Sequence, residues 1–195
     1  MIARLAPACV VLAGAGLFGP TSIAAAAAEP APAVGVASAT TAQTEAILLP
    51  VPVIAQARER CGPASLAMVL RYHGAPDSAV AEADRAYSPA LRGALITDLE
   101  RAAERAGFAA RVAAVTEDTL LAMIRDSIPP VLHYRSGVGP FTRGHYGVLV
   151  GWDPARREYL VNDGGSRTAR YRRDDLARRW KAAGSLALIV SRRAP

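Results

Sequence analysis

The pattern of apolar residues changes from helical to strand-like near residue 108. Before that point we expect an extended segment and then three helices, over residues 47–54, 61–73, 78–87 and 97–106. Thr97 and Glu100 predict a capping box at the start of the third helix. After it we expect strands over 108–115, 131–134, 145–152, 158–163 and 186–191, and helices over 116–127 and 174–182. Helices followed by an antiparallel sheet predict an α+β domain.

The first of these helices carries a cysteine at its start. Pro63 suits the first turn, where a missing N–H costs nothing, and Gly74 ends the helix. Nearly every residue between them is apolar, which is typical of a helix enclosed by its domain. A thiol at a helix N-terminus meets free backbone N–H groups and the positive end of the dipole, which lower its pKa. Cys61 is therefore a candidate nucleophile.

The N-terminal residues 1–28 have the features of a secretory signal peptide. Arg4 precedes an apolar run from Leu5 to Phe18, which is too short to span a bilayer comfortably. The alanines just before Glu29 offer small-residue cleavage sites. We therefore expect an exported chain, periplasmic or extracellular, with no membrane span after cleavage.

The rest of the chain divides into a linker and one domain. Residues 29–46 are rich in Ala, Pro, Thr and Val, which predicts a flexible linker. Residues 47–195 are enough for one domain with its own core. Without residues 1–28 the chain has 22 basic and 17 acidic residues, and its arginines are scattered. This favours a solvated basic surface over nucleic-acid binding.

Cysteine usage makes the candidate nucleophile stand out. Cys9 leaves with the predicted signal peptide, so the exported chain keeps Cys61 alone and cannot form an internal disulfide. An unpaired thiol in an oxidising compartment is a liability unless it is buried or used in chemistry. A buried structural cysteine is the ordinary alternative. The position of Cys61 at a helix start favours catalysis.

Of the three histidines, His145 is the best placed to act as a base for Cys61. His73 lies twelve residues further along the same helix, about 18 Å along its axis. It cannot meet the thiol and is expected near the helix end. His133 lies within a predicted strand, where a hydrogen-bonded structural role is the simpler interpretation.

The predicted hairpin after His145 supplies a partner for its ring. If residues 152–156 form a five-residue loop, His145 lies directly opposite Asp163, within reach of an imidazole–carboxylate hydrogen bond. A loop of four or six residues would shift this register. Asn162 is the competing acceptor, but side chains alternate along a strand and only one of the two can point at His145. The register favours Asp163, although Asp-Gly-Gly is also an ordinary turn sequence.

A cysteine enzyme also needs hydrogen-bond donors for the oxyanion that forms during attack on a carbonyl. Gln56 lies just upstream of Cys61, and its side-chain amide can donate beside the Cys61 backbone N–H. A glutamine in a loop means little alone. Before a cysteine that begins a buried helix, it is a candidate oxyanion donor.

These motifs resemble the C39 peptidase family of papain-like cysteine proteases. The resemblance runs from about Val53 to Val190 and keeps the order of four motifs: Gln56, Cys61-Gly62-Pro63, Gly144-His145-Tyr146-Gly147 and Asn162-Asp163. It implies a papain-like fold in which a helical lobe carries Cys61 and a sheet lobe carries His145 and Asp163. It also implies a Cys-His-Asp triad, Gln56 as oxyanion donor, a peptide or protein substrate, and no metal or cofactor.

The chain also departs from the best-known members of that family. Those members remove leader peptides after a double glycine and are fused to ABC exporters. This chain has no Walker A motif or transporter segment and carries an export signal, so it resembles the stand-alone secreted branch. Gly164 stands where proline often follows the aspartate. A transglutaminase-like acyltransferase and a non-catalytic peptide-binding module stay open as alternatives, as do the cleavage specificity and the oligomeric state.

Overall fold

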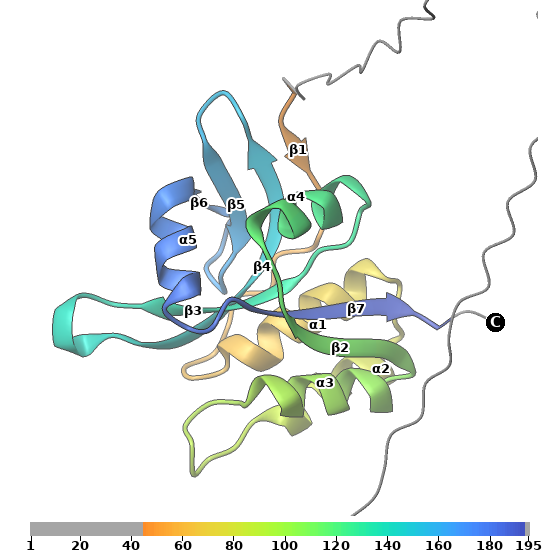
Figure 1. The fold of residues 1–195 in the computed structure, drawn as a ribbon. Helices are drawn as coiled ribbons and strands as arrows, with labels where there is room; N and C mark the ends of the chain where they lie inside the picture. Colours follow the sequence, from red (N-terminus) through yellow and green to blue (C-terminus); the bar gives the residue numbers. More distant parts are fainter. Residues whose placement is uncertain (1–44, 194–195) are drawn as a thin grey trace, which may run out of the picture. The chain divides into compact units, whose positions relative to one another are not determined.

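Residues 45–193 are described by the computed structural model, and they fold as helices first and a sheet second (Figure 1). The predicted signal peptide, residues 1–28, lies outside the described residues. So does the predicted linker, residues 29–46, except for its last two positions. These two predictions therefore stay predictions.

The helices confirm most of the elements expected from the sequence. They are α1 (Cys61–Tyr72), α2 (Asp77–Val80), α3 (Ile96–Arg105), α4 (Glu117–Arg125) and α5 (Arg173–Lys181), with 3-10 turns at η1 (Ala81–Ala86) and η2 (Gly139–Phe141). The expected second helix is therefore split into one α-helical turn and a 3-10 segment. The capping box is wrong, because α3 follows Leu95 without a side-chain cap. Glu100 instead accepts the Val112 N–H at 2.9 Å and ties α3 to the sheet.

A single antiparallel sheet contains all seven strands of the described residues. The strands are β1 (Ile47–Leu48), β2 (Phe108–Ala114), β3 (Val131–Ser136), β4 (Arg143–Asp153), β5 (Glu158–Asn162), β6 (Ala169–Arg172) and β7 (Leu186–Arg192). Their order is β2-β7-β3-β4-β5-β6, and the short β1 pairs with β4. The α+β class is confirmed, and β6 is a strand that the sequence did not predict.

The buried helix α1 lies against the middle of this sheet. It packs on β4 and β3, and α3 packs between α1 and the β2–β7 edge. The apolar side chains of α1 are buried, with Leu66, Met68, Val69 and Leu70 fully inaccessible. In Figure 1, α1, α2 and α3 lie in the lower part of the domain near β2 and β7, and α4 and α5 lie in its upper part beside β4, β5 and β6. As predicted, α1 is apolar on nearly all sides because the rest of the domain encloses it.

The hairpin register differs from the predicted one. The connection between β4 and β5 has four residues, 154–157, and Asp153 pairs with Glu158. A shift between Leu149 and Gly151 marks a β-bulge, so that Val148 pairs with Asn162. The prediction that His145 faces Asp163 directly is therefore wrong, because the turn lies further along the chain than residues 152–156 and the bulge restores only one residue of the resulting offset.

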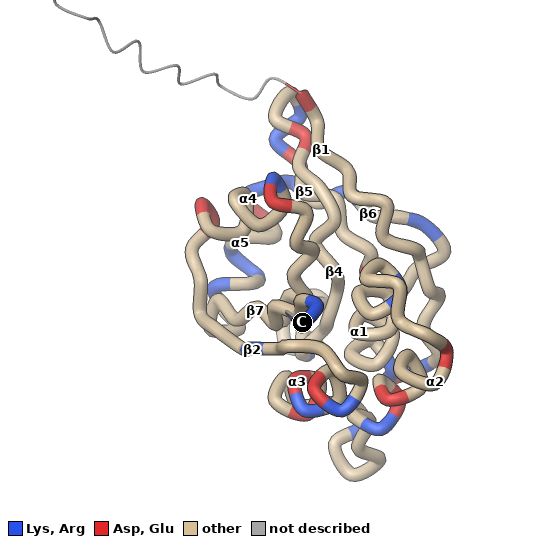
Figure 2. The backbone as a smooth tube through the Cα atoms, turned by 90° about the vertical axis from the view of Figure 1, so that its right-hand side faces the viewer, with Lys and Arg blue, Asp and Glu red and all other residues tan. Residues whose placement is uncertain are grey.

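Charged residues of both signs are interspersed along the backbone in Figure 2, with red and blue positions side by side on α3. Many form ion pairs; Glu117, for example, binds Arg173 at 2.9 Å and Lys181 at 3.2 Å. This is the arrangement of a solvated surface. Within residues 45–193, no helix has the length and apolar character needed to cross a membrane.

Candidate active site

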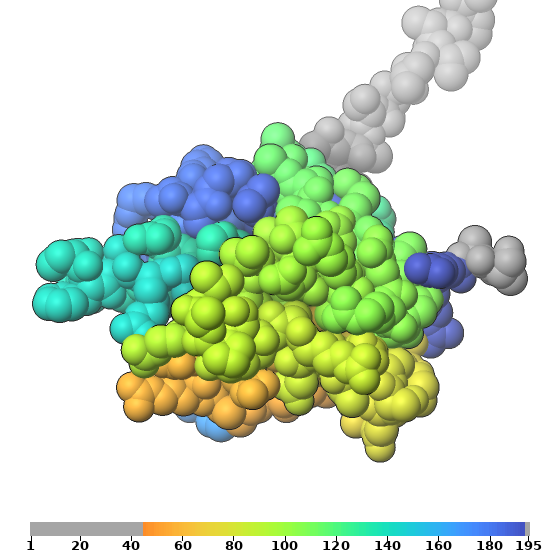
Figure 3. Space-filling model, turned by 90° about the horizontal axis from the view of Figure 1, so that it is seen from below, coloured from red at the N-terminus to blue at the C-terminus, as the bar shows by residue number. Residues whose placement is uncertain are grey.

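A surface cavity of about 620 Å³ lies where the start of α1 meets the start of β4. Its walls come from the segment before α1, the loop before α3 and the β3–β4 hairpin, which lie side by side in Figure 3. Three of the four residues predicted for the site line it, namely Gln56, Cys61 and His145. A space of this size suits a small-molecule ligand or a short stretch of peptide.

Cys61 is the first residue of α1 and is half-buried in the cavity wall. It is a free cysteine. Arg60 precedes it and provides no side-chain cap, so no side chain competes for the first N–H groups of the helix. The predicted position of the thiol at the positive end of the helix dipole is confirmed.

Cys61 and His145 hydrogen-bond to one another and shift each other's protonation. Burial alone would raise the pKa of the Cys61 thiol, but the bond to His145, its charge and backbone bonds from Tyr146 and Gly62 lower the pKa below its usual value. Burial alone would lower the pKa of His145, but the contact with Cys61 and the Asp163 carbonyl raises it above its usual value. Both shifts favour a thiolate paired with an imidazolium.

The backbone of Asp163 determines which ring nitrogen of His145 faces the thiol. His145 Nε2 lies 3.0 Å from the Asp163 carbonyl oxygen. A carbonyl can only accept, so Nε2 must carry a hydrogen and donate it. Nδ1 is then the nitrogen left for Cys61. Asp163 meets His145 as predicted, but through its main chain rather than directly through its carboxylate.

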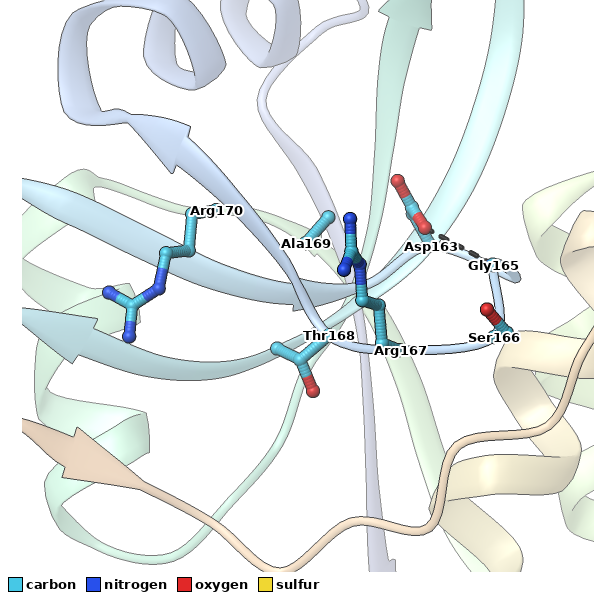
Figure 4. Close-up of a pocket in the computed structure, with 7 residues that line it drawn as sticks. All are labelled: Asp163, Gly165, Ser166, Arg167, Thr168, Ala169 and Arg170. Carbon is cyan, nitrogen blue, oxygen red and sulfur yellow. Dashed lines mark hydrogen bonds between the residues drawn. The ribbon is translucent and has the colours of Figure 1, made fainter.

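The Asp163 carboxylate is held by other donors. Its Oδ1 accepts the Gly165 N–H at 3.2 Å, the dashed line in Figure 4, and its Oδ2 accepts the Tyr171 hydroxyl at 2.8 Å. The side chain lines a second surface pocket formed by the β5–β6 loop, where Arg167 points to the same side. Burial lowers the pKa of His145 and the contact with Cys61 raises it. The negative charge of the Asp163 carboxylate raises it by a smaller amount.

Gln56 is joined to the loop that follows Asp163. Its backbone N–H donates to the Gly164 carbonyl at 2.9 Å. Gly164 has a φ of +89°, and an added Cβ there would lie 2.5 Å from Gln56 Cδ. Proline, with its φ fixed near −65°, cannot adopt that conformation. Two features therefore require glycine after Asp163: the left-handed backbone conformation and the close approach of the Gln56 side chain.

Sequence reasoning missed several parts of this site. His133 lies on β3 and bonds to the backbone of Ala183, as expected of a structural histidine, but it also lines the cavity and its ring packs against Tyr146 at a centroid distance of 4.9 Å. The Tyr146 hydroxyl donates to the Ala94 carbonyl at 3.0 Å and joins β4 to the loop before α3. His73 lies where it was expected, at the far end of α1, 3.1 Å from the Val190 carbonyl. These contacts join residues distant in sequence, so no local pattern predicts them.

Comparison of the sequence with protein families gives a match to the family described as the Peptidase_C39 like family, over residues 48–188. This range includes all four residues predicted for the site. A search of curated proteins gave no match.

Solved structures with the same fold support that match. They include a double glycine motif protease from an AMS/PCAT transporter in complex with its leader peptide, which is 21% identical with a TM-score of 0.59 over 75% of this chain and 94% of that one. The peptidase domain of Streptococcus ComA, a bifunctional ABC transporter, is 21% identical with a TM-score of 0.59 over 73% and 99%. A C39-like peptidase from Bacillus anthracis is 18% identical with a TM-score of 0.61 over 77% and 100%. The shared fold is the papain-like one.

Proposed function

The chain belongs to the Peptidase_C39 like family and is a cysteine peptidase, and we propose that it hydrolyses peptide bonds with Cys61 as nucleophile, His145 as acid and base, and Asp163 as the residue that orients His145. The observation that carries this proposal is the hydrogen-bonded Cys61–His145 pair in the wall of an open cavity. The proposed substrate is a peptide or protein, since a solved relative of the same fold holds a leader peptide.

In the first half of the reaction, the Cys61 thiolate attacks the carbonyl carbon of the scissile bond. The carbonyl oxygen becomes negatively charged in the tetrahedral intermediate. His145 then transfers its Nδ1 proton to the leaving amine, the C–N bond breaks, and an acyl-enzyme remains on the Cys61 sulfur.

In the second half, His145 is neutral and acts as a base. Its Nδ1 takes a proton from water, whose oxygen attacks the thioester carbonyl, and the carboxylic acid leaves as the thiolate is restored. The Asp163 carbonyl keeps Nε2 protonated in both halves. Nδ1 of His145 therefore donates the proton in the first half of the reaction and accepts one in the second.

Gln56 and the Cys61 backbone N–H are the proposed donors to the oxyanion. Support for this role comes from the position of Gln56 in the wall of the same cavity and from its backbone bond to Gly164, which limits its movement. Donors fixed before the reaction stabilise developing charge without reorganisation, which is the main advantage of such a site.

The reaction is tested by digesting a diverse peptide library with residues 29–195 and reading the products by mass spectrometry. We expect hydrolysis by the native protein, none by Cys61→Ala, and a loss in kcat/KM of about 1,000-fold or more for His145→Ala, because the thiol then lacks its base. The matched control is His73→Gln, a histidine substitution at the far end of α1, which should keep wild-type activity.

The same digest separates the two alternatives. Addition of a primary amine diverts the acyl group to an amide if the chain is a transglutaminase-like acyltransferase. Peptide binding that is unchanged in Cys61→Ala, with no product from the native protein, indicates a binding module. Either result contradicts the proposed hydrolysis.

The role of Gln56 has its own test. Gln56→Ala should lower kcat by about 100- to 1,000-fold with little change in KM, because the lost donor acts on the oxyanion that exists only during reaction. Alkylation of Cys61 by iodoacetamide forms no oxyanion, so its rate should stay close to that of the native protein. An equal loss in both rates would show that Gln56 supports the thiolate rather than the oxyanion.

We also propose that the chain is exported, on the basis of the signal-peptide features of residues 1–28. Expression of the full chain in a bacterium with a secretory pathway should yield a mature protein that begins close to Glu29. The mass of the purified protein measures this. Cytoplasmic protein that retains residues 1–28 would contradict the proposal.

A further inference from the structure

Tyr171 on β6 holds the carboxylate of Asp163. Its hydroxyl donates to Asp163 Oδ2 at 2.8 Å, the shorter of the two bonds to that carboxylate. A hydrogen bond to an ionised acceptor contributes more than one between neutral groups. His145 Nε2 bonds to the main-chain carbonyl of Asp163, whereas the two carboxylate oxygens bond to Gly165 and Tyr171. Asp163 is therefore held by its side chain on one side and meets the imidazole with its backbone on the other.

Residue 163 lies just after the end of β5, where the ladder to β4 stops at Asn162. Strand pairing therefore does not fix the direction of its carbonyl. The carboxylate bonds to Tyr171 and Gly165 supply that restraint, together with the Gly164 carbonyl that accepts the Gln56 N–H. Of these, the bond from Tyr171 is the one made by a side chain on another strand.

Aromatic packing fixes the Tyr171 ring in turn. Tyr134 is fully buried, with its ring edge-on to His145 at 5.4 Å and edge-on to Tyr171 at 6.0 Å. Tyr134 thus contacts both His145 and Tyr171. Burial raises the pKa of Tyr171, its contact with Tyr134 opposes this effect, and its bond to Asp163 adds to it. The phenol keeps its proton near neutral pH and stays a donor.

We propose that Tyr171 is a positioning residue for catalysis: by holding the Asp163 carboxylate it sets the Asp163 carbonyl against His145 Nε2, and so keeps Nδ1 aimed at Cys61. This inference rests on the proposed function and extends it to a residue on β6. Tyr171 does not touch the cavity around Cys61 and acts only through Asp163 and His145.

The test is Tyr171→Phe, which removes one oxygen and leaves the ring. We expect kcat to fall about tenfold with KM unchanged, since a bond to a charged group is lost and peptide binding is untouched. The pH profile gives a second readout. The contact with Asp163 raises the pKa of His145, so weakening it lowers that pKa and moves the alkaline limb of kcat to lower pH.

Tyr159→Phe is the matched control, because that hydroxyl also donates to a carboxylate, Glu117 Oε2 at 3.3 Å, outside the cavity lining. It should leave kcat and both limbs of the profile unchanged. A double-mutant cycle with Asp163→Ala completes the test. In that background Tyr171→Phe should have almost no further effect, because the carboxylate that Tyr171 holds is already gone.

A native protein that cleaves peptides together with a Tyr171→Phe variant of unchanged kcat and pH profile would overturn the positioning role and leave the proposed function standing. Equal losses in Tyr171→Phe with and without Asp163→Ala would also overturn it. No cleavage by the native protein would contradict both. If Tyr171→Phe fails to fold, 3-fluorotyrosine at position 171 keeps the ring and lowers the pKa of the phenol, so that the donor is lost at lower pH: an earlier alkaline loss of kcat supports the role, and an unchanged alkaline limb contradicts it.

Discussion

The hydrogen bond between His145 Nε2 and the backbone carbonyl of Asp163 determines how the rest of the site works. Because a carbonyl cannot donate, it leaves Nδ1 of the ring for Cys61. Burial opposes the charged form of both partners, since on its own it lowers the pKa of His145 and raises that of Cys61. Their contact reverses both shifts. The proposed nucleophile and base therefore depend on one another, because turning the imidazole away from Cys61 removes the contact that lowers the pKa of the thiol.

Two hydrogen bonds to main-chain carbonyls bring the elements that carry this pair together. The bond from the Gln56 N–H to the Gly164 carbonyl joins the segment before α1 to the loop after β5. The bond from Tyr146 to the Ala94 carbonyl joins β4 to the loop before α3. Each contact links the helical half of the domain to the sheet on one side of the cavity. The thiol and the imidazole come from different halves, so their distance depends on these links and on the packing of α1 against β4.

The sequence predicts what local patterns control. The buried helix with Cys61 at its start, the strand that carries His145 and the α+β class follow from periodicity and from the stop signal at Gly74. The hairpin register was wrong, because it depends on loop length and on a bulge next to Gly151. An added Cβ at Gly151 would lie 2.2 Å from the Ile47 carbonyl oxygen, so this glycine lets β1 approach. The role proposed for Tyr171 was missed for a similar reason. The strand β6 is short and half-exposed, and the bond from Tyr171 to Asp163 joins two residues that no local pattern pairs.

The pH dependence of Cys61 alkylation by iodoacetamide tests most directly whether the pair exists. It needs no substrate, and Cys61 is the one cysteine in residues 29–195. The account predicts that alkylation of the native protein persists well below the usual thiol pKa of about 8.5. It also predicts that His145→Ala moves the midpoint upward, because burial then acts on the thiol without its partner. A native midpoint at or above the usual value, unchanged in His145→Ala, would contradict it.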